Sequence, residues 1–185
     1  DLSNYPRKIL FGLHENACNL ACPKCLVHSE SYPQGIALKK SLGTMDIESI
    51  IKVFDEVKES APTVSPSFWS EPLVNNKLFR SFVIEASARN IPVMINTNAL
   101  LIADEMAEFL VEHLDQISIS IDAMTEETLV KTRATDQLDK IKNAVFLLLE
   151  KRGARRSPRI VVSFSSEECN ISEREDFVDF WVQHV

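Results

Sequence analysis

The chain has 185 residues and a net charge of −7, with 45% hydrophobic and 25% charged residues. This length and composition are ordinary for one soluble globular domain. No apolar run is long enough to cross a bilayer, and the acidic balance gives no general attraction to nucleic acid or to an anionic membrane. The first residues also lack the pattern of a secretory signal, so we expect a cytoplasmic protein that acts on neither membranes nor nucleic acids.

Short apolar runs alternate with segments of helical periodicity along the chain. An apolar strand at 7–13 precedes an irregular stretch that reaches about residue 43, after which Thr44 is expected to cap a helix. The predicted strands are 7–13, 63–68, 92–96, 116–121 and 160–164. The predicted helices are 44–59, 77–89, 104–113, 125–131, 137–152 and 173–185.

This alternation of strand and helix predicts an α/β fold with parallel strands, because each helix must return the chain to the same end of the sheet. A partly closed barrel and an open doubly wound sheet both fit the pattern. In either fold, ligands bind at the carboxyl ends of the strands. The loops that follow Leu13, Phe68, Asn96, Ile121 and Phe164 should therefore share one face.

Three of the four cysteines lie in one short loop directly after the first strand. Cys18, Cys22 and Cys25 form the segment C-N-L-A-C-P-K-C, with the spacing Cys-x3-Cys-x2-Cys, whereas Cys169 stands alone. A disulfide scaffold would spread its cysteines to link distant loops, so the cluster favours a metal. Closely spaced thiolates in a loop are the ligands of iron–sulfur clusters.

Two other interpretations of the loop stay open on spacing alone. A structural zinc site could add His28 or His14 to the three cysteines, giving a Cys3His set in a non-catalytic α/β binding domain. A redox pair of Cys22 and Cys25 is the second, although it leaves Cys18 unexplained.

A Cys-x3-Cys-x2-Cys loop after the first strand of an α/β sheet resembles the radical S-adenosylmethionine (radical SAM) superfamily. The resemblance implies that the three cysteines hold a [4Fe–4S] cluster. It also implies that one electron from the cluster cleaves S-adenosylmethionine, and that the resulting 5′-deoxyadenosyl radical takes hydrogen from a substrate. It further implies a peptide or small-molecule substrate, such as a carbohydrate, and an electron donor such as flavodoxin or ferredoxin. An electron-transfer iron–sulfur protein remains an alternative.

The resemblance also refines the expected architecture. The family core is a partial (β/α)6 TIM-like barrel, of which five βα units are visible here. We therefore expect residues 1–185 to be a radical SAM core domain that stops before its last unit. Relatives often add a C-terminal domain with auxiliary clusters.

After the second and third strands, the resemblance assigns four cofactor-binding residues. Glu71-Pro72 matches a Gly-Gly-Glu-Pro-like segment that holds the methionine amino group, with Ser70 replacing a glycine. Asn96 and Asn98 lie near a Thr-Asn-Gly-like segment, in which Ala99 replaces the glycine. Glu71 could instead be a solvated loop carboxylate, and the asparagines could simply cap a turn.

Four further positions complete the predicted cofactor site. Ser120 matches a serine that contacts the cofactor in relatives, and Arg133 matches an arginine that pairs with the methionine carboxylate. Phe164 could pack against the adenine or belong to the core. Lys24 precedes the third cysteine, where the family more often has an aromatic residue.

Overall fold

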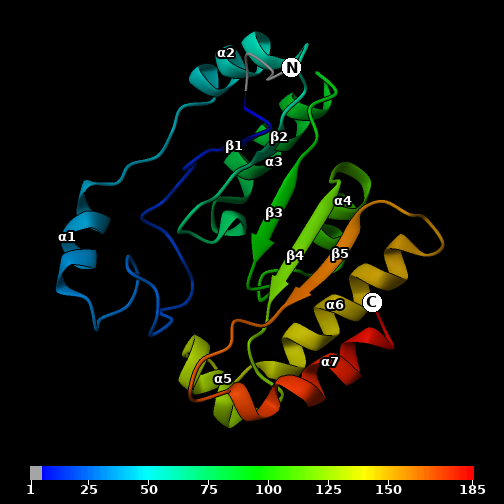
Figure 1. Cartoon of the computed structure of the whole chain (residues 1–185). Helices are drawn as coiled ribbons and strands as arrows, with labels where there is room; N and C mark the ends of the chain where they lie inside the picture. Colours follow the sequence, from blue (N-terminus) through cyan, green and yellow to red (C-terminus); the bar gives the residue numbers. More distant parts are fainter. Residues whose placement is uncertain (1–5) are drawn as a thin grey trace.

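The computed structural model describes residues 6–185 as a curved layer of parallel strands covered by helices (Figure 1). The strands are β1 (Lys8–Leu10), β2 (Thr63–Ser65), β3 (Met94–Thr97), β4 (Gln116–Ser120) and β5 (Arg159–Ser163). The α-helices are α1 (Pro33–Ser41), α2 (Ile47–Val57), α3 (Asn76–Ser87), α4 (Asp104–His113), α5 (Glu126–Arg133), α6 (Leu138–Arg152) and α7 (Arg174–Val182). Two 3-10 turns, η1 (Pro72–Asn75) and η2 (Ile171–Glu173), lead into α3 and α7.

The strands follow one another in sequence order, and all pairs are parallel. β1 pairs with β2, and β3, β4 and β5 form a second set. A parallel bridge between Val64 and Val93 joins the two sets, with the Val64 amide 2.8 Å from the Pro92 carbonyl. The prediction of a parallel α/β fold of partial-barrel type is therefore confirmed, and the carboxyl ends of the strands open on one face.

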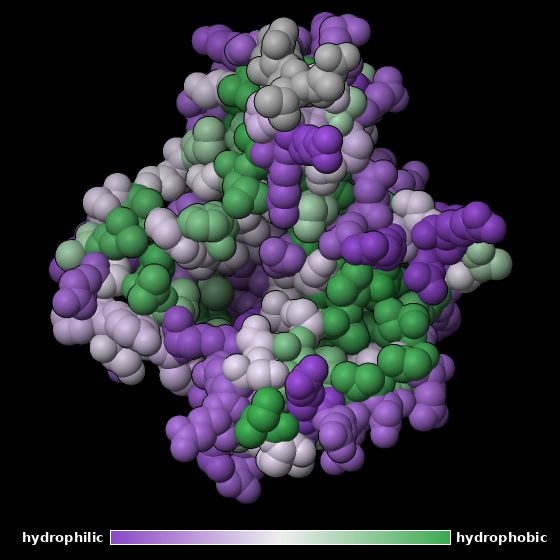
Figure 2. All heavy atoms as spheres, viewed as in Figure 1, coloured by the Kyte–Doolittle hydropathy of each residue, from purple (hydrophilic) through white to green (hydrophobic). Residues whose placement is uncertain are grey.

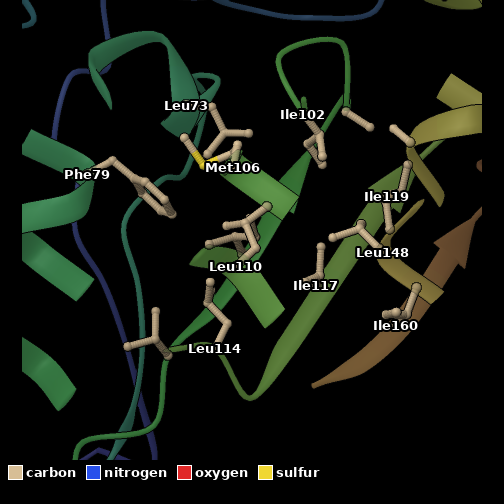
Figure 3. Close-up of a cluster of buried hydrophobic side chains, with 14 of the residues drawn as sticks. Leu73, Phe79, Ile102, Met106, Leu110, Leu114, Ile117, Ile119, Leu148 and Ile160 are labelled. Carbon is tan, nitrogen blue, oxygen red and sulfur yellow. The ribbon is translucent and has the colours of Figure 1, made fainter. Parts of the chain in front are cut away.

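The core lies between the outer face of this layer and the helices. Ile117 and Ile119 are completely buried, as are Leu110 of α4 and Leu148 of α6 (Figure 3). Ile121 is completely buried as well. The alternation in β4 places Ile117 and Ile119 on the helical side, because successive side chains of a strand point to opposite faces, and Ile121 directly follows the strand.

A cluster of three phenylalanines fills the other end of the core. The rings of Phe11, Phe54 and Phe82 meet edge to face, with centroids 5.0 to 5.4 Å apart. All three rings are buried, and such pairs stabilise a fold beyond the area that they remove from water. This cluster joins the loop after β1 to α2 and α3.

The region before residue 44 differs from the prediction, because it contains the helix α1. Pro33 lies in the first turn of α1, where the missing N–H removes no hydrogen bond of the helix. Gly35 is the one buried residue of α1. The helix therefore has almost no apolar stripe, which is the signal that periodicity detects.

The cap of α2 is also not the predicted residue. The Asp46 side chain accepts from the Ser49 amide at 2.8 Å, whereas Thr44 bonds the ring of His14. The second strand stops at Ser65 rather than at residue 68, since Pro66 has no N–H to donate to the ladder. Among the described residues, no helix has both the length and the apolar character needed to cross a membrane.

Candidate functional site

A pocket of about 250 Å³ opens at the carboxyl ends of the strands, beside the cysteine loop. Figure 2 shows the hollow between the part of the molecule that carries α1 and the sheet. All three clustered cysteines line it. Seven of the eight predicted cofactor residues line it as well: Lys24, Ser70, Glu71, Asn96, Asn98, Ser120 and Arg133.

The three cysteines are half-buried, and burial disfavours the free thiolates of Cys18 and Cys22. Burial raises the pKa of Cys18 to about 11. Burial also raises the pKa of Cys22, although the nearby Arg133 partly opposes the effect. The loop is folded on itself, since the Cys25 amide donates to the Cys22 carbonyl at 2.9 Å. Thiols in this state must lose protons when they bind a metal, so metal binding and proton release are coupled here.

The structure does not form the Cys3His set that a zinc site would need. His28 lines the same pocket, and its backbone amide lies 3.3 Å from the Cys25 sulfur. In residues 6–185, no three His, Cys, Asp or Glu side chains converge as ligands of a single ion, and this holds for the three cysteines with or without His28.

Glu71 is buried, with 4% of its surface exposed, so it is not a solvated loop carboxylate. It accepts hydrogen bonds from the Thr97 hydroxyl and the Asn98 amide, both at 2.8 Å, and from the Leu73 amide at 3.3 Å. Desolvation raises its pKa to about 6, despite these bonds. Glu71 thus ties the loop after β2 to the end of β3 at the wall of the pocket.

Glu15 is a site residue that the sequence did not reveal. Its carboxylate, in a residue only 5% exposed, accepts from the amides of Phe68 and Trp69 at 3.0 and 2.5 Å and from the Ser70 hydroxyl at 3.1 Å. It therefore fixes the loop in which the family-like glycines are replaced. The predicted residue Ser70 reaches the pocket, but its hydroxyl is engaged by Glu15.

Asp122 organises the opposite wall. One of its oxygens lies 3.0 Å from the Lys24 ammonium and 3.2 Å from the Arg133 guanidinium. Lys24 also pairs with Glu167 at 2.7 Å. Through these two ion pairs, Lys24 connects the cysteine loop to the loop after β4 and to the loop after β5.

The backbone around Asp122 is held equally closely. Its second carboxylate oxygen accepts from the Ser165 amide at 2.7 Å. The fully buried Asn170 donates to the carbonyls of both Asp122 and Ser165. Asp122 has a φ of 63°, a left-handed conformation that aspartate tolerates better than most residues.

The two predicted asparagines have different roles. Asn98 is buried; its side-chain amide donates to Asn19 at 2.8 Å, and its oxygen accepts from the Leu100 amide at 3.0 Å. It joins the cysteine loop to the turn after β3. Asn96 is exposed on β3 at the pocket, and Ser120 lies at the end of β4 on the same wall.

Phe164 is the predicted cofactor residue that the structure does not bring to the pocket. Its ring packs on Phe177 of α7, with centroids 4.9 Å apart, and it contacts the core. The sequence had left both roles open, and α7 supplies the apolar partner.

Unpartnered polar atoms concentrate at this pocket. Within residues 6–185, five buried side-chain nitrogens lack a hydrogen-bond partner. Three of the five belong to residues of this pocket: Nδ1 and Nε2 of His28, and Nε of Arg133. Leaving a buried polar group unpaired costs on the order of 1–3 kcal/mol. A polar ligand in the pocket would supply the missing partners.

A model of the Radical SAM superfamily matches residues 13–166. The chain belongs to the Radical SAM superfamily. The match spans the cysteine loop and the strands β2 to β5, so the resemblance inferred from the cysteine spacing is confirmed. The cofactors of this family are a [4Fe–4S] cluster and S-adenosylmethionine.

Solved structures of radical SAM enzymes share the fold. An anSMEcpe structure with bound AdoMet superposes with a TM-score of 0.76 at 18% identity, over 95% of this chain and 46% of that one. SuiB of Streptococcus suis bound to S-adenosylmethionine gives 0.67 at 14%, over 94% and 38%. BtrN in complex with AdoMet and 2-DOIA gives 0.60 at 17%, over 87% and 57%.

These identities establish the fold and no more. The chain spans less than half the length of the anSMEcpe and SuiB chains. A search of curated protein sequences finds no match.

The residues of the pocket fit the family's cofactors. Three thiols that line one pocket are donors of the kind that iron–sulfur clusters use, and a four-iron cluster held by three of them would keep one iron for another ligand. The unpartnered Nε of Arg133 and ring of His28 are suited to anionic or sulfur acceptors. Family membership thus favours the cluster over the zinc site.

Proposed function

We propose that this chain is the catalytic core of a radical SAM enzyme that takes hydrogen from a peptide substrate. The observation that carries the proposal is that Cys18, Cys22 and Cys25 line the same pocket as the unpartnered polar atoms of His28 and Arg133. This pocket lies at the carboxyl ends of the strands, where α/β folds bind their ligands.

In this proposal the three cysteines hold the cluster, which when bound supplies the electron that cleaves S-adenosylmethionine. Arg133 binds the methionine carboxylate through Nε, the donor that Asp122 leaves free. Asn96 and Ser120, whose side chains lie at the pocket, contact the rest of the cofactor.

In this proposal Glu71 both holds the loops of the pocket together and accepts from the methionine amino group. Its three protein hydrogen bonds fill most of its acceptor capacity and fix its position, which leaves one lone-pair direction for the methionine amino group. Ser70 and Asn98 bond Glu15 and Asn19 and so hold the neighbouring loops in place. They affect cofactor binding indirectly, by fixing the shape of the pocket.

A peptide substrate is supported by two structural neighbours. One anSMEcpe structure contains a Cp18Cys peptide, and one SuiB structure contains its precursor peptide SuiA. A small molecule is the second candidate, favoured by the BtrN complex with 2-DOIA. We further propose flavodoxin or ferredoxin as the electron donor, and the reducing cytoplasm as the compartment that keeps the cysteines available.

The test is anaerobic reconstitution of the chain with iron and sulfide. We expect a brown protein with about four iron atoms per chain, whose visible absorbance bleaches with dithionite. Added S-adenosylmethionine should then yield 5′-deoxyadenosine. Peptides with deuterated side chains should transfer deuterium to that product.

Alanine at Cys18, Cys22 or Cys25 should abolish iron binding, whereas Cys169→Ala should keep it, since Cys169 is exposed and outside the pocket. A colourless protein that holds one zinc would refute the proposal. A cluster without cleavage of S-adenosylmethionine would point to electron transfer alone.

A further inference from the structure

His28 is buried near the cysteine loop, and its ring nitrogens make no well-formed hydrogen bond. It is 7% exposed, and neither Nδ1 nor Nε2 makes a hydrogen bond of normal geometry in the structure. Burial lowers the pKa of His28, and the backbones of Glu15 and Trp69, which lie near the ring, oppose this only partly. An imidazole always carries at least one N–H, so at least one donor here is unsatisfied. Burial without a partner is costly for such a group, and this calls for an acceptor that enters the pocket.

Three other donors at the pocket are already engaged within the chain. The Lys24 ammonium bonds Asp122 and Glu167, and the Ser70 hydroxyl bonds Glu15. The Asn98 amide bonds Asn19. Among the buried polar atoms of residues 6–185 that line this pocket, the unpartnered donors belong to His28 and Arg133 alone.

The position of His28 favours a sulfur acceptor. It follows Cys25 by three residues, and its own backbone amide donates to the Cys25 sulfur at 3.3 Å. The Ser29 amide in turn bonds the Cys25 carbonyl at 3.1 Å, so the segment 25–29 is wrapped around that cysteine. The imidazole is therefore attached to a backbone that is already in contact with a cluster ligand.

We propose that His28 is a positioning residue that donates a side-chain hydrogen bond to a sulfur of the cluster held by Cys18, Cys22 and Cys25, and thereby raises the reduction potential of that cluster. Hydrogen bonds to cluster sulfurs stabilise the more negative, reduced state. The inference rests on the proposed function, because it requires the cluster to be present.

The test compares reduction potentials of the reconstituted chain by redox titration followed by electron paramagnetic resonance. His28→Leu removes the donor at similar volume. At the potential where half of the wild-type cluster is reduced, we expect the ratio of reduced to oxidised cluster in this variant to fall about three- to tenfold. A tenfold fall corresponds to about 59 mV for a one-electron couple.

Three further variants separate the hydrogen bond from packing. His28→Gln restores an N–H donor and should return the ratio to within about twofold of wild type, the residual that a small change in reach would leave. His28→Ala is a second donor-free variant if the leucine variant does not retain its cluster. His113→Leu is the control, since His113 lies on α4, packs on Phe109 and does not line the pocket.

A potential unchanged in both donor-free variants, or equally lowered in His28→Gln, would overturn the role of His28 while leaving the proposed function intact. Failure of the wild-type chain to assemble a cluster would instead refute the proposed function. Loss of one bound zinc in His28→Leu, from a colourless wild-type protein, would make His28 a zinc ligand and overturn both.

Discussion

Replacing Asp122 with asparagine should destabilise the apoprotein strongly, because it removes one charge from a buried ion-pair network. The asparagine keeps the shape, and its oxygen can still accept from the Ser165 amide. Its side-chain NH2, however, would face the Lys24 and Arg133 donors that the carboxylate now accepts. The variant therefore isolates the charge from the packing.

The two pairs contribute unequally to the expected loss. The Lys24 side chain is 32% exposed and keeps Glu167 as a partner, so its pair with Asp122 is discounted to about 0.5–1 kcal/mol. The Arg133 side chain is 14% exposed against 1% for Asp122, and breaking such a buried pair costs about 2–3 kcal/mol, below the range for a fully buried one. Together the two pairs give an expected loss of about 2.5–4 kcal/mol.

Urea unfolding followed by circular dichroism measures this loss. With a slope of about 2 kcal/mol per molar urea, the midpoint should fall by about 1–2 M. Asp55→Asn is the matched control: Asp55 also pairs with an arginine and a lysine, Arg89 and Lys58, but on the surface, and should change the midpoint little. If Asp122→Asn shifts the midpoint no more than this control, Asp122 does not organise the loops.

Two other predictions concern the pH and the contact of α1. Burial raises the pKa of Glu71 to about 6 from an ordinary 4.5, so the folded state binds the Glu71 proton more tightly than the unfolded state does. This proton binding stabilises the fold fully below about pH 4.5, and the stabilisation is lost as the pH rises through about 6. From pH 7 to pH 5, the unfolding free energy of the apoprotein should therefore rise by about 1 kcal/mol more than that of Glu71→Gln; equal pH slopes would contradict this. Gly35→Ala would place a Cβ 1.7 Å from the Leu26 carbonyl oxygen, so it should lower the free energy of unfolding by about 1–3 kcal/mol and weaken iron binding. Gly43→Ala, whose Cβ would have no atom within 4 Å, should change neither urea unfolding nor iron binding. Similar effects of the two variants would contradict the close contact.

The elements with strong periodicity were predictable from the sequence. The helix at 104–113 was predicted with its observed bounds, and the isoleucines of β4 fall on the buried face that their alternation indicated. The helix α1 could not be predicted in this way, because it buries one glycine rather than an apolar stripe. Its place depends on contact with the cysteine loop, which no local pattern records.

The candidate site was predictable as a set of residues but not as a set of bonds. Spacing located the cysteines, and the family resemblance with the strand ends located seven of the eight predicted cofactor residues, at one pocket. The sequence could not show that Lys24 and Arg133 meet at Asp122, because that meeting requires the left-handed backbone at Asp122 and the turn held by Asn170. The role of Glu15 could not be predicted either, because the amides that it bonds belong to a loop that is distant in the sequence.

This network also determines the electrostatic setting of the cysteines. The two cations beside them, Lys24 and Arg133, are matched by Asp122 and Glu167, so these four groups add no net charge. An anionic cluster on three thiolates would therefore meet little compensating positive charge, and net charge is one of the factors that set a cluster's potential. Such a setting favours a low potential, as a strong one-electron reductant requires. A neutral donor such as His28 can then adjust that potential without reversing it, which is why its removal should shift the cluster's reduction rather than prevent its assembly.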